Sequence, residues 1–214
     1  MKKWIGLAAL TLMLAACNED EAKTEGADKE GNVVATTGQI ADAVKVISGE
    51  KLNVTTLMGP GVDPHLYKAT QGDMTTLENA EVIFYNGLHL EGQLQDIFDQ
   101  MGKDKTVFAA AEVLKDEQLL VDEEDASLND PHVWFDIMLW KEVVDGIGDT
   151  LVEEYPEYKA DFEKNEQDYL AKLDELAAYA KERVAEIPQE QRILVTAHDA
   201  FNYFGESLGF DVSG

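Results

Sequence analysis

The sequence predicts an α/β protein of two lobes, in which parallel sheets are joined by one long helix and the second lobe is incomplete. Short β-rich runs alternate with helical stretches through short connections up to residue 154, a pattern typical of a parallel sheet with helical crossovers. A single helical pattern then covers residues 155–187. The strand and helix pattern restarts at Pro188, but residues 189–214 are fewer than the roughly 40 usually needed for an independent fold.

The first 16 residues predict a secretory signal. Two lysines precede an apolar stretch from Ile5 to Leu14, which is too short to cross a bilayer. The stretch ends in LAAC, the form of a bacterial lipobox, in which Cys17 becomes the lipidated N-terminus. An ordinary cleaved signal with an incidental cysteine is the alternative, but Cys17 is the only cysteine and stands where cleavage is due. We therefore expect an extracytoplasmic protein anchored to the bacterial cell membrane through a lipid on Cys17.

A solvated tether is expected at residues 17–32, and the surface beyond it is acidic. From Asn18 to Asn32 no apolar side chain is larger than alanine, so the segment cannot bury surface. The formal net charge of the chain is −26. Such a surface repels nucleic acid and attracts cations, so no nucleic-acid partner is expected.

The first predicted lobe covers residues 33–154. Its strands are expected at residues 33–37, 52–58, 82–86 and 106–110. Its helices are expected at residues 38–47, 71–79, 91–101 and 137–154. Gly49 suits the end of the first helix, and an acidic loop at residues 115–130 precedes the last one.

The linking helix at residues 155–187 is bounded by two prolines. Pro156 suits a first helical turn, and Pro188 stops the run. Apolar side chains recur at steps of three, four or seven and form one stripe: Tyr158, Phe162, Tyr169, Leu173, Leu176, Ala180, Val184 and Ile187. A coiled-coil dimer is the alternative, but the stripe holds aromatic residues in place of a leucine seam. We expect a monomer whose long helix runs along the body and connects the two lobes.

Residues 188–214 are expected to begin the second lobe. A strand is predicted at residues 192–196, a helix at residues 197–208, and the start of another strand at residue 210. Gly205–Gly209 matches the G-x-S-x-G nucleophile elbow, but a helical stretch precedes it and no histidine follows it. We interpret Gly209 as a helix stop.

The tripeptide Asp-Pro-His occurs twice, at Asp63–His65 and at Asp130–His132. By composition, about 0.01 copies would be expected. Proline fixes φ and holds the preceding aspartate extended, so each imidazole projects from a stiff turn and loses little entropy when it binds a metal. Asp63 and Asp130 can orient the turn or accept a hydrogen bond from the ligand. The alternative is a pair of turns with solvent-facing histidines.

His198 is the third candidate metal ligand. His65 and His198 follow predicted strands, and His132 begins the loop-to-helix junction after the sheet. Because ligands bind beyond the carboxyl ends of parallel strands, these positions favour a metal site made by the three imidazoles. His89 is expected to be structural, since no proline stiffens its turn and its flanking leucines suggest packing.

Four stretches resemble the TroA-like solute-binding lipoproteins of bacterial manganese and zinc ABC transporters. They are GPGVDPHLYKAT, YNGLHLEG, DPHVWFDI and LVTAHDAFNYF, in this order, and the resemblance covers residues 33–214. It implies two α/β lobes, one rigid connecting helix and a metal held in the cleft by His65, His132 and His198. The fourth ligand of the family, an aspartate late in the second lobe, has no counterpart here. The resemblance also implies that the metal is delivered to the membrane permease of an ABC transporter.

Manganese is the favoured metal and zinc the next. Three imidazoles with a carboxylate suit zinc and tolerate manganese. Zinc receptors of the family commonly carry a histidine-rich loop before the second ligand motif, whereas residues 115–129 are acidic and contain no histidine.

Two functions of other classes remain as alternatives. A zinc metalloenzyme could use the three histidines and an open coordination position. A surface adhesin is permitted by the lipid anchor, but no residue specifically supports it. The expected function is that of a binding protein, not an enzyme.

Overall fold

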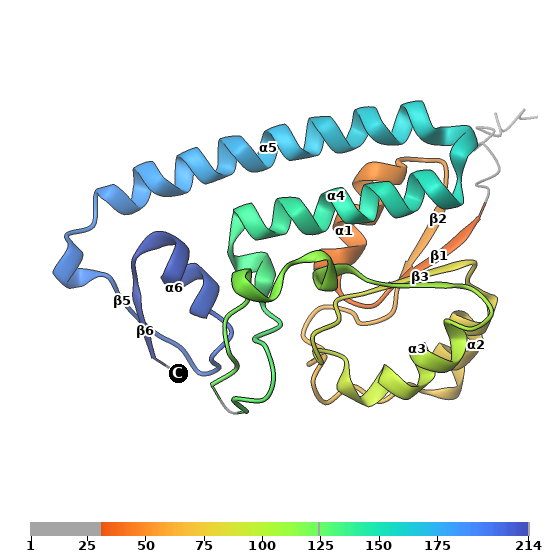
Figure 1. Ribbon diagram of the computed structural model, residues 1–214, viewed down its shortest axis with the longest axis horizontal. Helices are drawn as coiled ribbons and strands as arrows, with labels where there is room; N and C mark the ends of the chain where they lie inside the picture. Colours follow the sequence, from red (N-terminus) through yellow and green to blue (C-terminus); the bar gives the residue numbers. More distant parts are fainter. Residues whose placement is uncertain (1–30, 124, 214) are drawn as a thin grey trace, which may run out of the picture.

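The computed structural model describes residues 31–123 and 125–213, and Figure 1 shows their arrangement. The predicted signal peptide, Cys17 and the tether up to residue 30 lie outside the described residues. Four parallel strands form the main sheet in the order β2-β1-β3-β4. They are β1 (Asn32–Ala35), β2 (Asn53–Thr56), β3 (Val82–Tyr85) and β4 (Thr106–Ala109). The chain reverses its direction of travel across the sheet between β1 and β3, where open α/β sheets bind their ligands.

Helices cover both faces of this sheet. They are α1 (Gly38–Ser48), α2 (Gln71–Asn79), α3 (Gln95–Met101) and α4 (Ile137–Glu154). Alternate side chains of β1 and β3 point to opposite faces. One set packs with α1 and α4: Val33, Ala35, Val82 and Phe84. The other set packs with α2 and α3: Val34, Ile83 and Tyr85. Figure 1 shows the same layers, with α1 and α4 on one side of the strands and α2 and α3 on the other.

Local chemistry accounts for the boundaries of the first helices. The Thr37 hydroxyl accepts a hydrogen bond from the Ile40 amide, which ends β1 and starts α1. Gly49 follows α1 with a φ of 57°, a conformation that favours glycine, as predicted. Thr70 and Asp73 form a reciprocal capping box at the start of α2. Each strand of the sheet is shorter than the expected β-rich run.

The linking helix is one turn shorter at its start than expected. A 3-10 turn, η5 (Pro156–Tyr158), precedes α5 (Lys159–Ala185). Phe162 and Leu173 on the apolar stripe are buried, whereas Leu176 is 48% exposed and Tyr179, farther along α5, is 60% exposed. The first half of α5 packs on α1 and α4, and the second half continues past the N-terminal end of α4 (Figure 1).

The C-terminal segment, residues 189–213, holds a second sheet of two parallel strands. Its elements are β5 (Ile193–Val195), α6 (Asn202–Leu208) and β6 (Asp211–Ser213). The expected helix at residues 197–208 was wrong in its first turn, because α6 begins only at Asn202. The Thr196 hydroxyl donates to the His198 carbonyl at 2.7 Å, which closes a local turn there. Gly209 ends α6 in the left-handed conformation, with φ 75°, as predicted.

Candidate metal centre

Three loops bring His65, His132 and His198 together. His65 lies between β2 and α2, His132 precedes the 3-10 turn η4 (Val133–Phe135), and His198 lies between β5 and α6. One nitrogen from each ring lies within 4.8 Å of the other two. The Nε2 atoms of His65 and His132 are 3.2 Å apart. Two nitrogens that each bind one metal at about 2.1 Å lie about 3.0–3.4 Å apart, so this pair already has the spacing of two ligands.

His132 is the most firmly held of the three. It is 5% exposed, and its Nδ1 lies 2.7 Å from Oδ1 of Asp130, which also accepts the His132 backbone amide at 2.9 Å. The Trp134 ring packs against the imidazole at an interplanar angle of 74°, with centroids 5.3 Å apart. Because Nδ1–H donates to the carboxylate, the lone pair of Nε2 faces His65.

His65 stands on a more open turn. Oδ1 of Asp63 accepts the His65 amide at 2.9 Å and closes the turn, and Asp63 itself is exposed. Burial, followed by the nearby His132, holds the pKa of His65 below its usual value. The ring is therefore neutral near pH 7, which is the form that binds metal.

His198 is exposed and has a carboxylate partner that the sequence reasoning missed. Its Nδ1 lies 3.0 Å from Oδ1 of Asp199. In the Asp-Pro-His tripeptides the supporting aspartate stands two residues before the histidine. Asp199 instead follows His198 directly, so the tripeptide pattern did not point to it. Its contact frees Nε2 of His198, as the Asp130 contact does for His132.

His89 lies outside this cluster. Its ring is exposed and its φ is 62°, and the packing expected at this turn is made by the buried Leu90. The same stretch contributes in another way. Glu91 is 2% exposed and accepts hydrogen bonds from the Thr36 hydroxyl at 2.6 Å and from the Asn86 amide at 2.8 Å.

Glu91 thus bonds to the residues that follow β1 and β3 at their carboxyl ends. Asn86, which is one of these residues, also contacts the second ligand turn. The Asn86 side chain donates to the Pro131 carbonyl at 3.0 Å. The backbone next to His132 is therefore held by residues of the YNGLHLEG stretch, whose role sequence reasoning did not identify.

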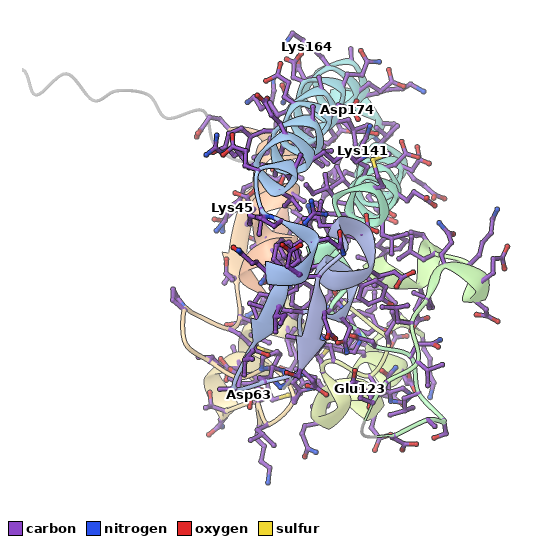
Figure 2. The ribbon with its side chains drawn as sticks, turned by 90° about the vertical axis from the view of Figure 1, so that its left-hand side faces the viewer. Lys45, Asp63, Glu123, Lys141, Lys164 and Asp174 are labelled. Carbon is purple, nitrogen blue, oxygen red and sulfur yellow. The ribbon has the colours of Figure 1, made fainter. Side chains whose placement is uncertain are left out.

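The imidazoles lie at a cleft of about 1210 Å³. Its walls come from the β2–α2 loop, α1, η4 and the middle of α5. Near the cleft-lining residues Trp140 and Leu173, Lys141 of α4 and Asp174 of α5 form an ion pair, and Figure 2 labels both side chains where the two helices pass each other. In the same view Asp63 lies at the other end of the molecule, below the C-terminal segment.

The family described as "ZnuA: Zinc-uptake complex component A periplasmic" matches residues 33–214. The manganese-binding lipoprotein MntA of Bacillus subtilis (strain 168) is 45% identical over 204 residues, which are 95% of this chain and 66% of MntA. The manganese ABC transporter substrate-binding lipoprotein scaA of Streptococcus gordonii is 33% identical over 97% of this chain and 69% of its own length.

Among solved structures, the periplasmic zinc-binding protein TroA from Treponema pallidum superposes with a TM-score of 0.83 at 44% identity. The match covers 86% of this chain and 66% of that structure, and it confirms the predicted α/β fold with parallel sheets and a long helix. The chain spans 66% of the length of MntA. As the four sequence stretches predicted, the chain belongs to the family of ZnuA and TroA.

Proposed function

We propose that this protein captures a divalent transition metal outside the cytoplasm and delivers it to the permease of an ABC transporter. One observation carries the proposal: three imidazoles from three separate loops present nitrogens within 4.8 Å of one another. Two of the rings also have a carboxylate on Nδ1, which leaves Nε2 for the metal. His65, His132 and His198 are the proposed ligands, with Asp130 and Asp63 holding their turns.

Manganese is the proposed cargo, with zinc next. Imidazole nitrogen binds both metals, so the donor set alone does not separate them. The loop before His132 is acidic and contains no histidine. Manganese appears in the names of MntA and scaA, and zinc in that of TroA.

The remaining parts of the proposal concern where the protein works. Cys17 would carry the lipid that anchors the chain to the cell membrane, and residues 17–32 would form the tether. Residues 33–154 would be the first lobe, 155–187 the linking helix and 188–214 the start of the second lobe, in a monomer. Among the described residues, no helix is both long and apolar enough to cross a membrane. The lipoprotein names of MntA and scaA support the anchor, and the ABC transporter in the name of scaA supports the permease partner.

The metalloenzyme alternative is weaker. A family made of binding proteins gives no precedent for catalysis at this site. The three histidines suit a captured ion as well as a catalytic one, and membership of this family favours the captured ion.

Calorimetric titration of manganese and of zinc tests the proposal. We expect His65→Ala and His132→Ala each to weaken binding at least tenfold, because each removes a metal ligand. His89→Ala is the matched control, since His89 is an exposed histidine outside the cluster, and it should bind as the unmodified chain does. Unchanged affinity in both ligand variants would refute the site, and a loss in His89→Ala would show that a different histidine binds the metal.

A further inference from the structure

We propose that Tyr203 and Asn202 are positioning residues that dock α6 onto the Asp130 turn and thereby hold His198 beside His65 and His132. The inference rests on the proposed function, because it concerns the same three histidines. α6 thus sets the position of the third ligand, His198.

The strand before His198 gives it little support. Ile193 and Val195 of β5 are 62% and 75% exposed, so most of the apolar surface of β5 packs against nothing among the described residues. His198 itself is exposed and lies in a turn outside any helix or strand. The loop must therefore be held from its other end, where α6 begins.

Tyr203 supplies the strongest attachment at that end. The side chain is 2% exposed, although it belongs to a segment that is otherwise largely open. Its hydroxyl donates to the Asp130 carbonyl at 2.9 Å and accepts the Leu120 amide at 3.0 Å. The Tyr203 hydroxyl thus satisfies two backbone groups that are remote from it in sequence. One belongs to the second ligand turn itself and the other to the segment that leads into this turn.

Asn202 ties the same turn through its side chain. Nδ2 of Asn202 lies 3.3 Å from Oδ2 of Asp130, while Oδ1 of this carboxylate holds Nδ1 of His132. The single buried carboxylate of Asp130 therefore contacts both His132 and the first residue of α6.

Phe201 completes the contact. Its ring lies on the Phe135 ring with centroids 4.4 Å apart and an interplanar angle of 37°. Three consecutive residues, 201–203, thus contact residues 130–135, and His198 precedes them by only three residues. The separation of the His132 and His198 rings, 5.1 Å between centroids, follows from this docking rather than from chain connectivity.

The test is a double-mutant cycle with zinc and cobalt(II) as probes. In the full chain, Tyr203→Phe removes only the hydroxyl, and Tyr179→Phe is the matched control because Tyr179 is 60% exposed on α5. We expect Tyr203→Phe to weaken zinc binding about tenfold and to shift the visible cobalt(II) spectrum toward that of His198→Ala. The double variant Tyr203→Phe/His198→Ala should bind no more weakly than His198→Ala alone. Tyr179→Phe should match the unmodified chain in both measurements.

The outcomes separate this inference from the proposed function. If neither His65→Ala nor His132→Ala weakens binding, the metal site itself is wrong. If His132→Ala weakens binding but Tyr203→Phe does not, or if the losses from Tyr203→Phe and His198→Ala simply add, only the docking inference is overturned. Unchanged binding in His198→Ala would overturn it as well. Asn202→Ala provides a second variant with the same expected pattern should Tyr203→Phe impair folding.

Discussion

The sheet region, residues 32–154, and the C-terminal segment, residues 189–213, both place a histidine beyond the end of a parallel strand, but they support it differently. In the sheet region, Val34 and Ile83 are at most 2% exposed, and helices cover both faces. In the C-terminal segment, the β5 residue Val195 is 75% exposed. The difference shows that a histidine loop is held firmly only where packed elements surround it. His132 has such support within the sheet region, from the buried Asp130 and Asn86, whereas His198 depends on contacts with the other region.

The largest difference between the two regions is expected when an apolar side chain in each is replaced by alanine. Phe84 of β3 is fully buried and its ring meets the Phe108 ring at 5.8 Å between centroids. We expect Phe84→Ala to lower the free energy of unfolding by about 3–5 kcal/mol, because it removes apolar contacts and leaves a cavity. Ile193→Ala in β5, which removes a 62% exposed side chain, should change it by less than about 0.5 kcal/mol. Urea unfolding followed by circular dichroism measures the stability of both variants. Equal losses of stability would show that the two regions do not differ in packing.

Hydrogen exchange should show the next largest difference. We expect the amides of β5 and β6 to exchange about 100-fold faster than those of β1 and β3, because a thinly covered two-stranded sheet opens locally. The β4 strand is the control, since it lies at the edge of the four-stranded sheet. If β4 exchanges as fast as β5, the edge position and not the missing cover explains the difference.

A smaller effect is expected at the end of α2. Nζ of Lys105 donates to three carbonyls there, those of Leu77, Glu78 and Ala80, at 3.0, 2.7 and 2.6 Å. Lys105→Met keeps the aliphatic stem but leaves these groups without their donor, which should cost about 1–2 kcal/mol of stability. Lys103→Met is the control, because Nζ of Lys103 donates to the exposed side chain of the nearby Gln100, at 2.8 Å, and not to the end of a helix in another part of the fold.

Thermal unfolding of the two lysine variants would decide whether such polar caps strengthen the sheet region. α6 ends instead at Gly209, without a lysine in its last turn. If Lys105→Met melts at the same temperature as Lys103→Met, the cap contributes nothing and the stability of the sheet region comes from its apolar core alone.

The smallest effect concerns pH and the half of α5 that packs on α4. Burial, followed by a hydrogen bond with Asp145, raises the pKa of Glu166 to about 7, and the Asp149 and Glu163 charges add to the shift. A raised pKa means that the folded chain holds this proton more tightly than the unfolded chain does. The stability from it is complete below about pH 4.5 and is lost as the pH rises to about 7.

Glu166→Gln should therefore melt with less dependence on pH between about 4.5 and 7 than the unmodified chain. Above pH 7, Glu166→Gln should raise the free energy of unfolding by less than about 1 kcal/mol, because Glu166 is only partly buried and solvent screens its neighbours. Melting temperatures across this range measure the effect, and Glu182→Gln, an exposed glutamate farther along α5, is the control. If the melting temperatures of both variants depend on pH in the same way, the pKa of Glu166 is not raised by burial and by Asp145.

Much of the fold follows from local sequence. The alternation of strands and helices, the ends of α1 and α6 at Gly49 and Gly209, and the break before Pro188 were all predicted, because each depends on backbone preferences over a few residues. The start of α6 was not predicted. Residues 197–201 have helical character in sequence, but the turn at His198 and the stacking of Phe201 on Phe135 involve contacts that sequence reasoning did not see.

The candidate site divides in the same way. The sequence by itself determined which histidines stand on stiff turns or at strand ends, since proline and strand position act locally. Only the tertiary structure decided that the two Asp-Pro-His turns differ. Asp63 is exposed and closes its own turn, whereas Asp130 is buried and shared between His132 and Asn202. Identical tripeptides acquire different roles because burial and remote partners depend on which segments pack together, and no tripeptide encodes that.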